Sequence, residues 1–206
     1  MNIKDFKLVA VIGGLVGLLS QPVLSNVIVR LQSAVPLPSL ALRAGFFFFF
    51  LILAPLALWI ASLLARVLPV IYQFAKFAAV GSLNSFVDLG VFNTEVILLG
   101  HLPGNVAFAV FKAISFLAAT TNSFFWNKHW TFESKSGTQS KEVASFYAIA
   151  ITGGLVNVGV ATLVKAIEPA AIPPELWINI IAPIAGIFST LFWNFAGYKF
   201  FVFKKA

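Results

Sequence analysis

The sequence has no cysteine, only two histidines and only seven acidic residues among its 206 positions. Without cysteine there is no disulfide framework, no thiol nucleophile and no cysteine-ligated metal site. His101 and His129, with so few carboxylates beside them, do not indicate a metal centre. No motif for nucleotide binding, metal-dependent hydrolysis or a nucleophile–base pair is present. We therefore expect no metal, no cofactor and no enzymatic activity.

Charge is also scarce, because only 10% of the residues are charged, whereas a soluble domain has about 25%. Hydrophobic residues make up 60% of the chain, and phenylalanine alone occurs 23 times. So few polar side chains cannot cover a surface in water, so the outside must face hydrocarbon. The composition predicts an all-α integral membrane protein. The net charge of +7 fits cytoplasmic loops beside anionic lipid headgroups better than it fits nucleic acid.

Apolar stretches of about 20 residues, the length of a helix that crosses a bilayer, mark the expected helices. Charge-free stretches cover residues 8–29, 44–65, 143–164 and 176–198. Two further apolar stretches, residues 74–99 and 105–126, contain charges. The pattern predicts six transmembrane helices. Lys4 and Lys7 before the first stretch also resemble a signal peptide, but the apolar run continues far enough to favour a retained helix.

Lysine and arginine are strongly biased to one side of this six-helix arrangement, which indicates its orientation. With the N-terminus inside, the cytoplasmic side receives Lys4, Lys7, Arg66, Lys76, Lys128, Lys135, Lys141, Lys199, Lys204 and Lys205. The outer side receives only Arg30, Arg43 and Lys165. The predicted inner boundary carries the aromatic side chains of Tyr72, Trp126, Trp130, Tyr147 and Tyr198. We expect both termini to be cytoplasmic.

The last four helices look like two copies of one helical hairpin. The first copy opens with Phe74, Gly81 and Leu83, which recur 72 residues later as Phe146, Gly153 and Leu155. It closes with Lys128, Trp130 and Phe132, matched 71 residues later by Lys199, Phe201 and Phe203. Chance likeness between apolar sequences is the alternative, but two nearly equal offsets favour parallel repeats. We expect a two-helix extension over residues 1–70 and a four-helix domain over residues 71–206, with repeats at 74–132 and 146–203.

The residues that carry the repeat also carry a family resemblance. The segment 74–81, with Asn84 and segment 87–92 after it, resembles the opening of GtrA-like proteins. The closing segments 122–132 and 194–203 resemble that family as well. The resemblance covers about residues 74–203 and implies a small four-helix domain in the bacterial inner membrane. It also implies translocation of polyprenyl-phosphate-linked monosaccharides for glycosyltransferases outside, in cell-surface polysaccharide synthesis. The two extra N-terminal helices depart from the family pattern.

Three charges interrupt the predicted helices, where a charge at mid-bilayer costs about 3 kcal/mol. Asp88 lies about 21 Å from the inner end of its helix, and Lys112 lies about 10 Å from the outer end of the next one. In a bilayer core of about 30 Å these depths nearly coincide, so the two side chains are expected to pair. Asn84, Asp88 and Glu95 share one helix face.

Two interpretations of these charges stay open. In the functional one, Lys112 meets a lipid-linked phosphate while Asp88 and Asn84 bind sugar hydroxyls. In the structural one, the ion pair only holds two helices together, and Glu95 is simply solvated near the outer interface. The aligned positions of the second copy are Val160 and Pro183, so the pair occurs once.

A second candidate site is a basic, amide-rich rim at the inner boundary. It contains Asn122, Asn127, Lys128, His129, Asn194 and Lys199. A phosphate headgroup could dock there from the cytoplasm. The alternative is ordinary positive-inside anchoring, with the asparagines joining helices.

Three functions are consistent with these patterns. The leading hypothesis is a translocator of a polyprenyl-phosphate sugar lipid. The others are a non-transporting subunit that anchors a glycosyltransferase partner and a proton-coupled exporter of small molecules. The predicted ligands are the sugar lipid and membrane lipids rather than nucleic acid, and self-association would help to enclose a path.

Overall fold

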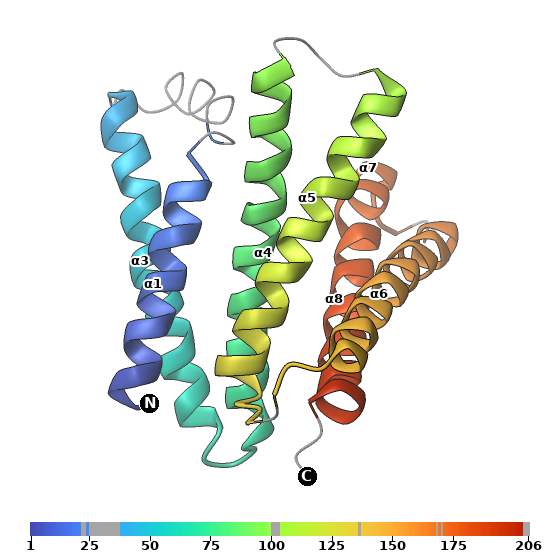
Figure 1. Ribbon diagram of the computed structural model, residues 1–206. Coiled ribbons are helices and arrows are strands. Elements are labelled where there is room, and N and C mark those ends of the chain that lie inside the picture. The colour runs from blue at the N-terminus through green and yellow to red at the C-terminus, as the bar shows by residue number, and fades with distance from the viewer. Residues whose placement is uncertain are drawn as a thin grey trace. The chain divides into compact units, whose positions relative to one another are not determined.

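The computed structural model describes residues 1–21, 24, 38–99, 104–135, 137–167, 169 and 171–203 (Figure 1). Within these ranges every regular element is helical. The α-helices are α1 (Ile3–Leu19), α3 (Ser39–Leu64), α4 (Val70–Leu99), α5 (Asn105–Trp126), α6 (Ser140–Ile167), α7 (Pro174–Leu176) and α8 (Ala182–Gly197). The π-helical segments are η1 (Asn127–Thr131), η2 (Trp177–Ile181) and η3 (Tyr198–Val202). The predicted all-α class is confirmed for this part of the chain.

Among the described residues, three helices are long and apolar enough to cross a membrane, namely Ser39–Leu64, Asn105–Thr131 and Ser140–Ile167. They contain three of the six predicted spans, and the count of six stays a prediction. The first predicted helix differs most from the structure, because α1 begins at Ile3 and not at residue 8. The Asn2 side chain caps this end of the helix by accepting a hydrogen bond from the Asp5 backbone N–H at 2.7 Å. α1 ends at Leu19. Residues 22–23 and 25–29 of that predicted span lie outside the described residues, as do Arg30, His101, Lys204 and Lys205.

The chain forms two compact units, residues 1–131 and 132–206. In the first, α1 packs against both α3 and α4, and α4 packs against α5. Figure 1 shows the start of α1, the α3–α4 turn and the end of α5 at one end of this unit. The N-terminal helices are thus joined to the first hairpin of the expected four-helix domain. The domain boundary predicted at residue 70 stays a prediction.

Close approach of α1 to α3 depends on two glycines spaced four residues apart. A Cβ atom on Gly13 would lie 2.5 Å from the backbone oxygen of Phe50, and one on Gly17 would lie 3.0 Å from Phe47. Glycine at this spacing lets helix backbones come together in a membrane. The adjoining core gathers side chains from α1, α3, α4 and η1: Val9, Ile12, Val16, Leu58, Val80, Leu83 and Trp130. By contrast, Phe48 and Phe49 on α3 are each 55% exposed, as a lipid-facing surface requires.

The second unit is built on α6 and α8. The Asn194 side chain occupies the space that a Cβ atom on Gly153 would fill, and the Thr190 hydroxyl donates to the Gly153 carbonyl at 2.9 Å. Near η3, the Phe146 and Tyr198 rings stack with centroids 3.9 Å apart. Gly153 therefore permits the close contact that holds this hairpin together.

The second helix of each hairpin ends in a five-residue π-helical segment, η1 after α5 and η3 after α8. The Lys128 ammonium lies 5.6 Å from the Phe124 ring centroid, and the Lys199 ammonium lies 5.5 Å from that of Phe195. These segments and these lysine–phenylalanine pairs are separated by the same 71 residues as the closing motifs of the sequence.

Candidate functional site

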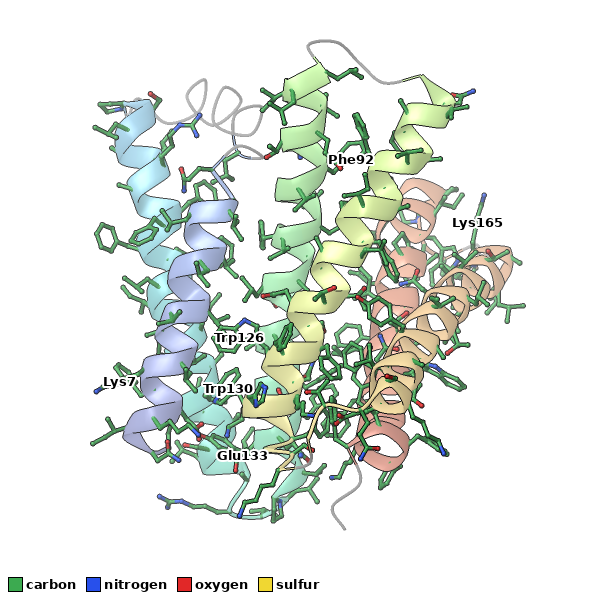
Figure 2. The ribbon with its side chains drawn as sticks, viewed as in Figure 1. Lys7, Phe92, Trp126, Trp130, Glu133 and Lys165 are labelled. Carbon is green, nitrogen blue, oxygen red and sulfur yellow. The ribbon has the colours of Figure 1, made fainter. Side chains whose placement is uncertain are left out.

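Asp88 of α4 and Lys112 of α5 form an ion pair with 2.7 Å between Oδ2 and Nζ. The pairing expected from their similar depths is therefore present. The Ser115 hydroxyl donates to the other carboxylate oxygen, Oδ1, at 2.5 Å. The Lys112 ammonium also lies 5.5 Å from the ring centroid of Phe92, on the upper part of α4 in Figure 2. Two helices thus supply one compact polar site.

This ion pair is only partly shielded, because the side chain of Lys112 is 40% exposed and that of Asp88 is 28% exposed. Each charge satisfies the other, which lowers the cost of placing both beside hydrocarbon. A half-exposed pair nevertheless contributes only about 0–1 kcal/mol of stability in water. The ammonium can reach a second anion while it stays near Asp88. A phosphate on Lys112 would leave carboxylate lone pairs of Asp88 for hydroxyl donors.

One helical turn from Asp88, the Asn122 amide donates to the Asn84 amide oxygen at 2.7 Å. The sequence placed these asparagines in two different candidate sites, whereas the structure joins them across α4 and α5. Each side chain keeps further hydrogen-bonding capacity, because an amide has two N–H donors and two acceptor lone pairs. The α4–α5 hairpin therefore carries a line of polar groups: Asn84, Asp88, Lys112, Ser115 and Asn122.

Glu95 lies apart from this line. It is half-buried and faces a cavity of about 380 Å³ that it shares with Leu18 and Leu19 of α1 and with Thr94. Its Oε2 atom is buried and has no hydrogen-bond partner among the described residues. The expectation that Glu95 is simply solvated does not describe this environment.

The predicted basic rim is not one exposed surface. Lys128 is 1% exposed and Asn127 is fully buried, whereas His129 is exposed with its ring stacked 6.5 Å from that of Phe125. Lys199 is half-exposed and belongs to the other compact unit. A common docking role for Lys128 and Lys199 stays a prediction.

A buried polar cluster centred on Asp5 was not predicted. The Asp5 carboxylate pairs with the Lys76 ammonium at 2.9 Å and accepts hydrogen bonds from Tyr72 and Trp130, each at 2.8 Å. The sequence indicated only that Lys76, Tyr72 and Trp130 are anchors at the membrane boundary. No sequence pattern pointed to Asp5, because its partners are distant in the sequence. Figure 2 shows Trp130 near the end of the unit where α1 begins.

Asp5 precedes the apolar stretch of α1, and its ionisation follows from its contacts. Burial alone would raise the pKa of this carboxyl. Hydrogen bonds from Lys76, Tyr72 and Trp130, together with the positive charge of Lys76, outweigh that effect and hold the pKa of Asp5 below its ordinary value. The cluster therefore contains a stable carboxylate with both of its oxygens hydrogen-bonded.

Comparison with known proteins shows the family of the region that contains the α4–α5 site. A family model described as the GtrA/DPMS transmembrane domain matches residues 76–203, which confirms the resemblance seen in the sequence. A protein of Bacillus subtilis (strain 168), named uncharacterized membrane protein YngA, is 32% identical over 82 residues. That alignment covers 39% of this chain and 51% of the relative, so the chain spans about half the length of that relative. No solved structure matches.

Proposed function

Because this chain belongs to the family of GtrA/DPMS transmembrane domains, a family of membrane proteins linked to the handling of polyprenyl-phosphate sugars, we propose that it moves a polyprenyl-phosphate-linked monosaccharide across the bacterial cytoplasmic membrane. The product would serve the synthesis or modification of cell-surface polysaccharide. One observation carries the proposal: the half-exposed Asp88–Lys112 pair lies within the family match, on two largely apolar helices.

The headgroup of such a lipid combines one phosphate with several hydroxyls, and the site offers a partner for each. Lys112 supplies a point charge on a long side chain for the phosphate. Asp88 and Asn84 accept or donate hydrogen bonds to the sugar. These contacts replace part of the water that the headgroup loses, which lowers the cost of crossing hydrocarbon. The sequence contains no nucleotide-binding motif, so we propose downhill movement driven by consumption outside.

The topology we propose has six spans, with both termini cytoplasmic and residues 74–132 and 146–203 as parallel repeats. Support for the repeats comes from η1 and η3, which end the two hairpins at equivalent positions. The polar pair occurs in one copy only, as an asymmetric substrate would require. Cysteine-accessibility labelling of introduced single cysteines at Lys135 and Lys165 tests this topology, which predicts that reagents reach these two positions from opposite sides.

The decisive experiment measures transbilayer movement of a polyprenyl-phosphate monosaccharide in liposomes that contain the purified protein. Lys112→Ala should abolish the movement, whereas Lys165→Ala, an exposed lysine near the end of α6, should leave it unchanged. Circular dichroism and gel filtration confirm that both variants are folded. Movement no faster than in protein-free liposomes, with folded wild type, would remove translocation from consideration.

A non-transporting role has one observation in its favour, since each carboxylate oxygen of Asp88 already has a partner within the hairpin, Lys112 on Oδ2 and Ser115 on Oδ1. In that case the protein would anchor or organise a polyprenyl-phosphate glycosyltransferase. Lys112→Ala would then weaken co-purification with the enzyme, and liposomes would show no lipid movement.

The Glu95 cavity favours a different alternative, a proton-coupled exporter of small molecules. The buried Oε2 atom of Glu95 has no hydrogen-bond partner among the described residues, and an intramembrane carboxylate that faces a cavity is a candidate site for the coupling proton. This function would depend on Glu95 or Asp88 and would tolerate Lys112→Ala, which separates it from the proposed translocation.

A further inference from the structure

A groove of about 320 Å³ lies between α1, α3 and α4 of the first unit. About half of the residues that line it are glycine or alanine: Gly13, Ala54, Ala57, Ala75, Ala78 and Ala79. Phe50 and Phe86, whose rings meet edge to face at 5.8 Å, complete part of the lining. The small residues leave room where larger ones would close the gap between the three helices.

Hydrocarbon suits this groove better than water does. Its one polar lining side chain is Ser82, whose hydroxyl already donates to the Ala78 carbonyl at 3.1 Å. An ordered water needs about 2–4 polar partners, which this lining does not offer. An apolar chain, by contrast, gains dispersion contacts with every wall. Part of the lining also belongs to α3, a helix long and apolar enough to cross the bilayer.

A polar pocket of about 410 Å³ lies further along the same three helices, lined by Asn2, Asp5, Ser62, Arg66 and Tyr72 among others. Ser62 is four residues, or about 6 Å, beyond the groove residue Leu58. Arg66 follows the end of α3 at Leu64, where lipid headgroups would meet the helix. The pocket is therefore at headgroup level when the groove is at hydrocarbon level.

The charge in this pocket favours an anion. Lys76 neutralises the Asp5 carboxylate, which is only 3% exposed. Arg66 is exposed, and no hydrogen bond or ion pair of its guanidinium occurs among the described residues. Lys4 and Lys7 add exposed positive charge on the first turns of α1. Arginine binds phosphate oxygens in a bidentate manner.

We propose that these two hollows together bind one anionic phospholipid, with an acyl chain in the groove and the phosphate on Arg66. Because the family match begins at residue 76, most of the site belongs to the N-terminal extension and to the turn after α3. This lipid would hold the extension against α4. The site is separate from Asp88 and Lys112 and does not depend on the proposed translocation.

Native mass spectrometry of the full chain in detergent tests the proposal, with phosphatidylglycerol and phosphatidylcholine as probes. Wild type should retain one phosphatidylglycerol more strongly than phosphatidylcholine. Ala78→Leu or Ala57→Leu would fill the groove and should remove the bound lipid. Ala113→Leu, the same change at an exposed position of α5, should leave binding unchanged. Equal binding by the groove variants and the control would overturn the proposal.

Arg66→Ala tests the headgroup contact. A single cation near the bilayer surface contributes about fivefold to the binding of an anionic lipid, so the preference for phosphatidylglycerol should fall by about that factor. An unchanged preference would contradict the role of Arg66. Displacement of phosphatidylglycerol by polyprenyl phosphate at lower concentration would overturn the assignment of the site to a phospholipid.

Discussion

Two lysine–aspartate pairs in the first unit have nearly the same geometry and very different surroundings. Lys76 and Asp5 are 6% and 3% exposed, and Tyr72 and Trp130 complete the coordination of the carboxylate. Lys112 and Asp88 are 40% and 28% exposed. In the first pair both carboxylate oxygens already have partners, and the pair links α1 to α4. The second keeps its ammonium within reach of an anion. The burial of the side chains and the number of hydrogen bonds to the carboxylate, rather than the length of the ion pair, distinguish a structural ion pair from a candidate binding site.

The largest effect is expected from breaking the buried pair. Lys76→Met removes the cation and leaves the Asp5 carboxylate buried without its charge partner, which costs about 3–5 kcal/mol. Chemical unfolding in detergent should show a loss of this size. Lys112→Met, the matched change in the exposed pair, should cost about 1 kcal/mol or less. Equal losses in the two variants would contradict the distinction.

A smaller loss is expected when the packing that positions Asp5 is disturbed. Gly13→Leu introduces a side chain where a Cβ atom already meets the Phe50 carbonyl, and overpacking of this kind costs about 1–3 kcal/mol. Gly14→Leu is the control, since the nearest atom to a Cβ there is the end of the flexible Leu51 side chain at 3.7 Å. Thermal unfolding followed by circular dichroism compares the two. Comparable stability in both variants would show that close α1–α3 contact is not required.

Acid should weaken the buried cluster gradually. Because the pKa of Asp5 is lowered in the folded protein, its stabilisation is fully present above the ordinary aspartate value of about 3.9. It is lost as the pH falls from there through the lower folded value. Unfolding at a series of pH values between about 2 and 6 should therefore show wild type losing more stability in acid than Asp5→Asn does. Parallel curves would mean that the cluster does not hold a charged Asp5.

At Asp88 we expect a small effect on stability together with a clear effect on function. Asp88→Asn keeps the shape of the side chain and removes a partly exposed charge, so stability should change by about 1 kcal/mol or less. Lipid movement in liposomes should fall severalfold, because Lys112 loses the carboxylate that orients it. An unaltered rate would leave Asp88 without a part in transport.

The sequence predicted the α4–α5 site better than it predicted the Asp5 cluster, and the reason is physical. The predicted span 105–126 forms a helix with the same limits in the structure. Opposite charges at similar depth in neighbouring membrane helices pair because an unpaired charge is costly in hydrocarbon. Ser115 was missed because a serine on a helix commonly bonds its own backbone, as it also does here with the Lys112 carbonyl.

The Asp5 cluster depends on tertiary packing that no local pattern encodes. Charges near Lys4 and Lys7 resemble the ordinary flank of a membrane helix, and only the folded chain brings Lys76 and Trp130 to Asp5. The four-residue spacing of Gly13 and Gly17 is itself a sequence signal for close helix packing, although it was not among the predictions. The close packing of α1 on α3 was therefore predictable from the two glycines, whereas the ion pair that links α1 to α4 was not.

The proposed function requires that Lys112 binds the lipid phosphate rather than only holding α4 to α5. The most direct test is the liposome assay with the double variant Asp88→Asn, Lys112→Gln, which removes both charges but keeps polar side chains of similar size in place. We expect a folded protein that no longer moves the polyprenyl-phosphate sugar. A folded double variant that moves the lipid at the wild-type rate would contradict this expectation and reduce the pair to a structural contact.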